Sequence, residues 1–211
     1  MLMPRTIALF QKTHPRIEIE VLEDVNQAIV RDLKTGKIDV AVGLIPEGMS
    51  GYVVRKLYRE QLTLFVADSL LERIYGDSAQ AVLDEVASTQ SLAPLESCPL
   101  LMTGLKDEDV IDRYVQQMCD QAGITPNVIV SSRNLETIFE LCVAGAGMTF
   151  APETLAMSTF AGKSVEGLRK ITLGDMRAYD ISIAWRSAPH VWSAITEFAE
   201  ALRASVKEQY S

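Results

Sequence analysis

The chain has 211 residues, of which 48% are hydrophobic and 23% are charged. This is the composition of a folded globular protein, and it excludes a disordered, fibrous or membrane-spanning chain. The 28 acidic residues outnumber the 20 Lys and Arg residues, which gives a formal net charge of −8 at pH 7. A surface that binds nucleic-acid phosphates is therefore not expected on this chain.

The first part of the chain predicts alternating helices and strands. Residues 3–13 place apolar side chains on one helical face, and a following proline ends that helix. Residues 17–21 alternate apolar and acidic side chains, which predicts a strand with one solvated face. Asn26 is expected to cap a second helix, and Gly36 is expected to end it. The apolar run over residues 38–45 predicts a parallel strand that is covered on both faces.

Much the same order of signals recurs later in the chain. A helix is predicted from about Asp107, followed by a strand over residues 127–130. Asn134 is expected to cap the next helix, which ends at Gly145, and residues 148–151 predict a buried strand. The recurrence implies two similar lobes.

The remaining elements connect these lobes. Residues 52–58 and 61–67 are strand-like, residues 180–185 predict a further strand, and residues 191–202 form an amphipathic final helix. A chain that leaves the first lobe near residue 60 and returns near residue 179 crosses between lobes twice. The predicted division is therefore lobe I at residues 1–59 plus 179–211 and lobe II at residues 60–178.

The cysteines and the N-terminus indicate the compartment. Cys98, Cys119 and Cys142 have no Cys-x-x-Cys spacing, so we expect them to be core residues in a reducing environment. The N-terminal residues have neither the continuous apolar stretch nor the small-residue cleavage site of a signal peptide. The sequence therefore predicts a cytoplasmic protein.

Catalytic and cofactor motifs are not found. His14 and His190 each stand beside a proline, outside any metal-ligand spacing or nucleophile elbow. The glycines at 145 and 147 follow a predicted helix and precede a strand, which reverses the order of a dinucleotide-binding loop. The acidic residues 107–109 begin a predicted helix, where the helix dipole favours them. We expect no enzyme activity, no cofactor and no metal.

A ligand site formed by loops is the remaining candidate. In open α/β sheets, ligands bind beyond the carboxyl ends of strands, where loops lead into helix N-termini. If the two lobes face each other, these loops line one cleft. The positions concerned are Asn26, Gly43, Leu44, Ile45, Thr103, Gly104, Arg133, Asn134 and Leu135.

Each of these positions also has an ordinary structural explanation. Asn26 and Asn134 would serve as helix caps alone, and Thr103 and Arg133 would lie in solvated loops. Arg133 beside a helix N-terminus favours an anionic ligand, whereas the acidic residues 107–109 disfavour a highly charged one.

Two sets of short motifs stand in a fixed order along the chain. The first set is Leu9-Phe, His14-Pro-Arg-Ile-Glu-Ile-Glu and Leu33-Lys-Thr-Gly-Lys-Ile-Asp-Val-Ala-Val-Gly-Leu. The second set is Ala122-Gly-Ile-Thr-Pro, Asn134-Leu-Glu-Thr and Val143-Ala-Gly-Ala-Gly-Met. Together they resemble the effector-binding domain of LysR-type transcriptional regulators, from residue 2 to about residue 203.

The resemblance implies an α/β protein with the type 2 periplasmic-binding-protein fold. In this fold two Rossmann-like lobes are joined by two crossing strands, and a small-molecule effector lies between them. The resemblance also implies a homodimer, and a tetramer in the full-length regulator. The partly apolar helix face over residues 3–13 offers a surface for self-association. Effector contacts are implied at the positions matched by Asn26, Val42, Gly43, Leu44, Thr103, Gly104, Asn134 and Leu135.

Three features depart from the family pattern. The family's first strand, with a polar residue at the mouth of the first helix, is expected upstream of Met1. The winged helix-turn-helix domain is absent from this chain, so DNA binding is expected only through that domain. The segment over residues 69–97 is longer than is usual for the family.

The leading hypothesis is therefore the effector-sensing and oligomerisation domain of a bacterial LysR-type regulator. The alternative is the solute-binding protein of a transporter, which uses the same fold. An enzyme on this scaffold is disfavoured because no base and nucleophile set is found.

Overall fold

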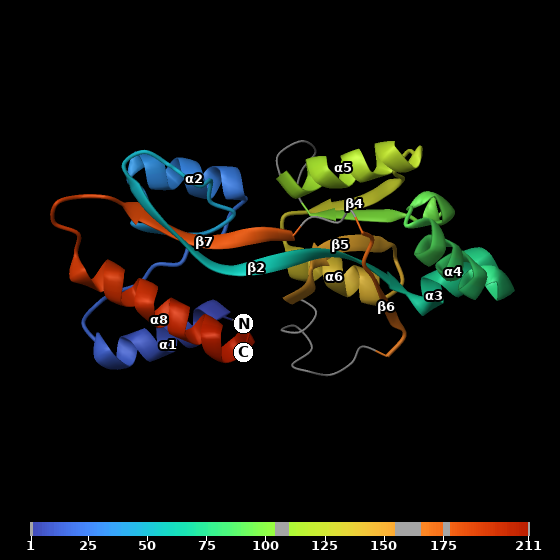
Figure 1. Ribbon diagram of the computed structural model, residues 1–211. Coiled ribbons are helices and arrows are strands. Elements are labelled where there is room, and N and C mark those ends of the chain that lie inside the picture. Colours follow the sequence, from blue (N-terminus) through green and yellow to red (C-terminus); the bar gives the residue numbers. More distant parts are fainter. Residues whose placement is uncertain (1, 104–109, 155–165, 175–177, 211) are drawn as a thin grey trace. The chain divides into compact units, whose positions relative to one another are not determined.

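The computed structural model describes residues 2–103, 110–154, 166–174 and 178–210 (Figure 1). The chain forms two compact units: unit 1 comprises Met1–Glu60 with Tyr179–Ser211, and unit 2 comprises Gln61–Ala178. Helices and strands alternate in both units, which confirms the predicted α/β class. None of the helices in the described ranges is long and apolar enough to cross a membrane.

Unit 1 has strands covered by helices on both faces. Its elements are α1 (Leu2–Thr13), α2 (Asn26–Thr35), β1 (Val40–Gly43), the first part of β2 (Tyr52–Ala67), β7 (Ala178–Arg186) and α8 (Ser193–Tyr210). The strand order is β1-β7-β2, and β1 runs antiparallel to β7. Helices α1 and α8 pack side by side below these strands in Figure 1, and α2 lies above them.

The core of unit 1 follows the alternation of side chains along its strands. Ala41 of β1 packs with Leu33 of α2 in one buried cluster. Its neighbours Val40 and Val42 pack with Leu202 of α8 in a second cluster. Strand β1 is therefore covered on both faces, as its nearly continuous apolar sequence predicted.

Two predictions for unit 1 are wrong. Residues 17–21 do not form a strand, because a strand also needs a neighbour within hydrogen-bonding reach, and the described residues provide none. The predicted parallel strand over residues 38–45 is the short β1, and the neighbour with which it pairs in the described structure is antiparallel. Alternation and hydropathy determine which face of a strand is buried, but they do not determine strand direction.

Unit 2 is built on a larger sheet. The second part of β2 is flanked by β6 (Leu168–Ile171) and β5 (Met148–Pro152), and the order continues through β3 (Leu100–Thr103) to β4 (Val128–Ser132). Strand β3 is parallel to both β4 and β5, whereas β5 and β6 are antiparallel to β2. The helices are α3 (Asp68–Tyr75), α4 (Ala79–Thr89), α5 (Val110–Ala122) and α6 (Leu135–Val143), with 3-10 turns at Gly76–Ser78 and Ala93–Leu95.

Helix α6 seals one face of this sheet. Its buried residues Ile138, Phe139 and Cys142 pack against Phe65 of β2 and Leu101 of β3. The rings of Phe65 and Phe139 meet edge to face, with centroids 5.0 Å apart. This contact fixes the position of α6, and so of its N-terminus, relative to the strand ends.

The two strand-like segments predicted around residue 60 form one continuous strand, because β2 runs through both units. The long segment that follows contains the helices α3 and α4.

Candidate ligand-binding site

Asn26 does not cap α2. It is the first helical residue, the N-cap residue is Val25, and no side chain caps this helix. Instead, Asn26 Oδ1 accepts a hydrogen bond of 3.0 Å from the backbone N–H of Leu44. The predicted capping role is therefore wrong, because the side chain of a residue already inside the helix faces the chain that leaves β1.

Gly43 makes this contact possible. A Cβ atom at Gly43 would lie 2.8 Å from Asn26 Oδ1, which is closer than real Cβ atoms approach an oxygen. The structure thus brings Asn26, Gly43 and Leu44 together at the carboxyl end of β1. Val42, the fourth residue predicted here, packs instead in the cluster that faces α8.

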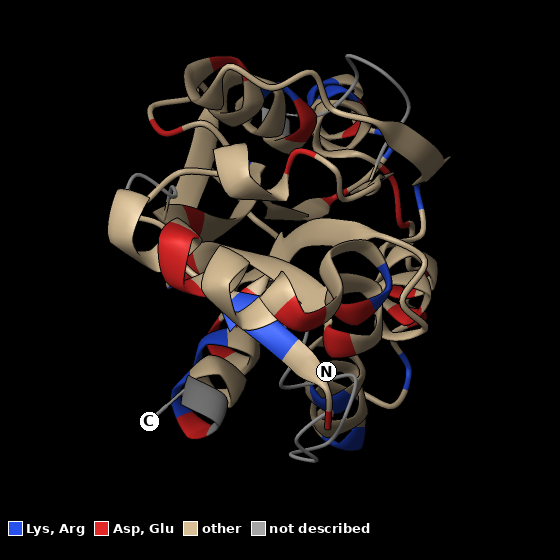
Figure 2. Ribbon diagram, turned by 90° about the vertical axis from the view of Figure 1, so that its right-hand side faces the viewer, with Lys and Arg blue, Asp and Glu red and all other residues tan. Residues whose placement is uncertain are grey.

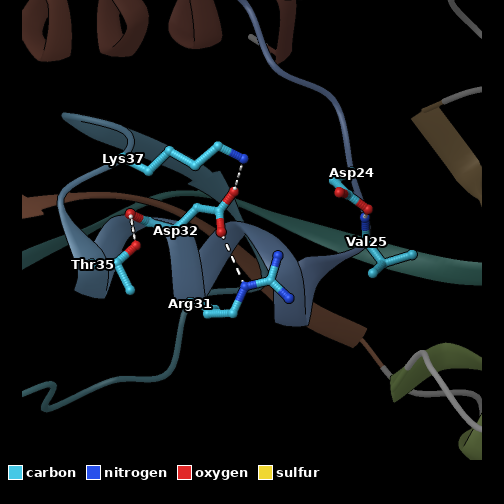
Figure 3. A network of polar contacts seen from close by, with 6 residues as sticks. All are labelled: Asp24, Val25, Arg31, Asp32, Thr35 and Lys37. Carbon is cyan, nitrogen blue, oxygen red and sulfur yellow. Dashed lines mark hydrogen bonds and ion pairs between the residues drawn. The ribbon is translucent and has the colours of Figure 1, made fainter.

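The turn from α2 into β1 is fixed by the Asp32 carboxylate (Figure 3). Arg31 Nε donates to Asp32 Oδ1 at 3.0 Å, and Lys37 Nζ donates to Oδ2 at 2.8 Å. Hydrogen bonds from the Lys37 and Arg31 side chains lower the pKa of Asp32 below its ordinary value. The helix ends at Gly36 in the left-handed conformation, with φ at 75°. These contacts therefore fix the path of the chain from the end of α2 to the start of β1.

In unit 2, the predicted cap of α6 is confirmed. Asn134 has extended backbone angles, and its Oδ1 accepts a 2.8 Å hydrogen bond from the N–H of Thr137. The hydroxyl of Ser132 in turn accepts a 3.1 Å bond from the N–H of Asn134. Leu135, the first helical residue, packs against the core. The cap side chain is exposed at the end of the sheet.

Thr103 lies beside this cap. Thr103 and Ser132 are direct neighbours in the register of the parallel strands β3 and β4, each at the carboxyl end of its strand. The structure therefore groups Thr103, Ser132 and Asn134 at one edge, with the exposed Arg133 between the last two. Gly104 lies outside the described residues. Sequence analysis missed Ser132, although a hydroxyl residue at a strand end just before a capping Asn is a signal for this role.

The N-terminus of α6 can hold a polar or anionic group. Helix N-termini leave backbone N–H groups without intrahelical partners and carry a partial positive charge. The side chain of Asn134 accepts a hydrogen bond from one of these N–H groups, and the exposed Glu136 in the first turn weakens the attraction for an anion. The group that this edge suits best is an uncharged hydroxyl or carbonyl, or a single carboxylate.

No metal or thiol chemistry is found in the part of the chain that the structure covers. It contains no group of three or more His, Cys, Asp or Glu side chains that could hold a metal ion. Cys98, Cys119 and Cys142 are buried free thiols, as predicted. Burial raises the pKa of Cys119 to about 11 and that of Cys142 to about 12. The acidic residues 107–109 lie outside the described residues.

Two α/β units with polar residues where strand ends meet helix N-termini have the architecture of a two-lobed ligand-binding domain. Residues 1–207 match the family described as "LysR substrate binding domain". The chain belongs to this family.

Solved structures of the same class agree in fold. The effector-binding domain of QuiR, solved in complex with shikimate, covers 99% of this chain and 92% of its own length, with a TM-score of 0.68 at 16% identity. A variant of the BenM effector-binding domain covers 99% of this chain with a TM-score of 0.67 at 20% identity. The reduced regulatory domain of OxyR from Pseudomonas aeruginosa gives 0.64 at 17% identity, over 98% of this chain and 91% of its own.

Curated relatives are transcriptional regulators. The hydrogen peroxide-inducible genes activator of Pectobacterium carotovorum is 26% identical over 72% of this chain and 45% of its own length. The DNA-binding transcriptional dual regulator OxyR of Escherichia coli is 24% identical over 96% of this chain and 61% of its own. The chain thus spans about half the length of the relatives it matches. These similarities favour the regulator hypothesis over a transporter solute-binding protein.

Proposed function

We propose that this chain is the small-molecule effector-sensing and oligomerisation domain of a bacterial LysR-type transcriptional regulator. The observation that carries the proposal is the family match over residues 1–207. DNA binding would belong to a domain outside this chain, in keeping with the net charge of −8. In Figure 2, blue basic and red acidic segments are interspersed along the ribbon, which supports the proposal that DNA binding belongs to another domain.

We propose that the effector is bound at the strand ends of both units. Unit 1 would contribute the chain segment that Asn26 holds in place, and unit 2 the edge formed by Thr103 and the cap of α6. Two hydrogen bonds, from the N–H of Leu44 to Asn26 Oδ1 and from the N–H of Thr137 to Asn134 Oδ1, hold the backbone at these positions. This preorganisation supports the proposed site. The proposed contact residues are Asn26, Gly43, Leu44, Thr103, Gly104, Arg133, Asn134 and Leu135, without Val42, which packs toward α8.

The effector is proposed to be a small polar molecule with at most one negative charge. The donors and acceptors at the α6 edge are hydroxyl, amide and backbone groups, which bind hydroxyl and carboxylate oxygens. QuiR, of the same fold, was solved with shikimate, which carries both kinds of group. Shikimate and related hydroxylated carboxylates are therefore the first probes.

Oxidation of a cysteine is not the proposed signal, although several relatives are named as peroxide-inducible activators. The reactive form of a cysteine is its thiolate. At a pKa of about 11, as for Cys119, about one thiol in ten thousand is ionised at pH 7. Burial of all three thiols further limits their access to an oxidant.

We propose that the domain forms a homodimer, and a tetramer in the full-length regulator. The apolar helix face that the sequence offered for this purpose is not exposed: Met3, Ile7 and Phe10 line a cavity inside unit 1. Large apolar side chains that are exposed, and therefore support self-association, are Leu9, Val21, Leu22, Val128, Ile129 and Trp192. A cytoplasmic location and the lack of enzyme activity follow from the proposed role.

The proposal is tested by a thermal-shift screen of small carboxylates, aromatic compounds and amino acids. A ligand that binds only the folded chain raises its apparent stability in proportion to the logarithm of its concentration. Binding of a hit by wild-type chain, with weaker binding by Thr103→Val, is the expected result. A hit that binds Thr103→Val and Asn134→Ala as tightly as it binds the wild-type chain would show that the site lies elsewhere.

A further inference from the structure

Gln90 has an unusual backbone conformation. It follows the last residue of α4 with φ at 54° and ψ at 34°, in the left-handed region. Among the residues that the structure describes, it is the only one other than glycine with a positive φ. Residues with a Cβ atom are disfavoured in this region, and glycine is the residue that usually ends a helix there. A glutamine at this position therefore indicates that its side chain has a role that glycine could not fill.

The side chain of Gln90 connects two segments of unit 2. Its Nε2 donates a 2.7 Å hydrogen bond to the carbonyl oxygen of Ala87, in the last turn of α4. Its Oε1 accepts a 2.8 Å hydrogen bond from the backbone N–H of Gly174, far along the chain. Because the first partner is an acceptor and the second is a donor, both contacts require the same orientation of the amide. These two contacts form the Gln90 bridge.

The bridge lies where the chain leaves unit 2. On one side it holds the end of α4, a helix in which only Val86 is buried. On the other side it holds Gly174, an exposed residue directly after the buried Leu173. The chain then enters β7 at Ala178, and β7 is the strand on which it returns to unit 1. The bridge therefore fixes the chain at the start of its connection to unit 1.

The closed bridge combines a cost and a gain of similar size. Left-handed backbone at a residue other than glycine costs free energy, and two hydrogen bonds recover a similar amount. Because Gln90, Ala87 and Gly174 are all exposed, water can replace both bonds when the bridge opens. An open state, with Gln90 in an ordinary conformation, is therefore close in free energy to the closed one, as a two-state element requires.

We infer that the Gln90 bridge is a conformational latch that opens and closes in the native chain and sets the freedom of the segment leading into β7. In the closed state, Gly174 is held against the end of α4. In the open state, the chain after Leu173 is released from that helix. Since β7 carries the chain between the two units, the latch acts on their connection. The inference does not depend on the proposed effector function.

Amide hydrogen exchange at Gly174, followed by NMR, tests the latch. Gln90→Gly keeps a residue suited to left-handed backbone and removes the side chain, whereas Gln90→Asn keeps an amide that is too short to reach both partners. We expect exchange at Gly174 to be about 2-fold to 12-fold faster in both variants, because its hydrogen bond is lost. Unchanged exchange at Gly174 in Gln90→Gly would overturn the inference.

Two controls show whether the change is local. Gln80→Asn alters another exposed glutamine of α4, whose side chain donates to Asp84 within the helix, and it should leave exchange at Gly174 unchanged. The N–H of Gly123 donates to the carbonyl oxygen of Asp120 in the same unit and should exchange at one rate in all variants. Equal acceleration at Gly123 and Gly174 would indicate a general loss of stability and would contradict a latch.

The balance of the two states is tested by thermal unfolding. Glycine removes the cost of positive φ together with the two hydrogen bonds, so the Tm of Gln90→Gly should lie within about 4 °C of the wild type. A larger decrease would mean that the bridge is a permanent support of the fold.

The reach of the latch is tested at the start of β7. In Gln90→Gly, we expect faster amide exchange at Ala178, Tyr179 and Asp180 as well as at Gly174, because the preceding chain is released. Acceleration confined to Gly174 would refute the link between the latch and the connection to unit 1.

Discussion

Replacing Asn134 separates its role as a helix cap from its proposed role in effector binding. Asn134→Ala removes the acceptor that holds the N–H of Thr137 at 2.8 Å. Loss of a cap costs about 1 kcal/mol, with a range of about 0.5 to 2. For a protein of this size that corresponds to a decrease in Tm of about 2 to 4 °C for each kcal/mol. Thermal unfolding followed by circular dichroism measures this decrease.

Two matched variants make the result specific to the cap. Asn134→Asp retains a side-chain acceptor and adds a charge that the helix N-terminus favours, so its Tm should equal or exceed that of the wild type. Asn127→Ala changes another exposed Asn, which precedes β4 and caps no helix, and should leave Tm unchanged. Equal stability of Asn134→Ala and wild type would refute the reasoning from the cap.

Thr103→Val completes the comparison. Valine has nearly the shape of threonine and lacks its hydroxyl, so the half-buried site should remain folded. Loss of one hydrogen bond to an effector costs about 0.5 to 1.5 kcal/mol, or up to about 3 if the effector group is charged, which is about 2-fold to 100-fold in affinity. Calorimetry with a hit from the screen should show weaker binding by Thr103→Val without a change in Tm. Unchanged affinity would remove Thr103 from the site.

Three further outcomes are expected. Gly43→Ala should break the hydrogen bond between Asn26 and Leu44 and lower the free energy of unfolding by about 0.5 to 1.5 kcal/mol. Because Asn26→Ala removes the same bond, the double variant should be destabilised by less than the sum of the two single effects, and full additivity would contradict this. The pKa of Asp32 is lowered in the folded chain, so the contribution of this carboxylate to stability is complete above the unfolded value near 3.8 and is lost as the pH falls through the folded value. Urea unfolding of Asp32→Asn should therefore depend less on pH in acid than that of the wild type. An acid dependence identical to that of the wild type would count against the ion pairs of Asp32. The native chain should react slowly with thiol reagents at pH 7 and gain no oxygen from dilute peroxide by mass spectrometry, whereas rapid modification of Cys119 would show that burial does not protect it.

Features set by neighbouring residues were predictable from the sequence. The end of α2 at Gly36 and the cap of α6 at Asn134 depend on contacts within a few residues, and the structure has both. The burial of β5 also follows from its own apolar run, Met148–Pro152.

Features set by distant residues were not predictable. The antiparallel partner of Val40 is Trp185, far along the chain, and no local pattern specifies that direction. Residues 17–21 have the alternation of a strand, yet pairing requires a neighbour that the described residues do not supply. The place of Thr103 beside Ser132 likewise depends on the register of two strands separated by a helix.

Asn26 and Asn134 show how one local signal gives two structures. They occupy matching places in the repeated order of elements, and both were expected to cap a helix. Asn134 stands before its helix with extended backbone angles, so its side chain reaches the N–H of Thr137 in the first turn. Asn26 stands within its helix, so its side chain accepts instead from Leu44, after the next strand. Substitution of Asn134 should therefore weaken one helix start, whereas substitution of Asn26 should loosen the join between α2 and the end of β1, where Gly43 leaves space for it.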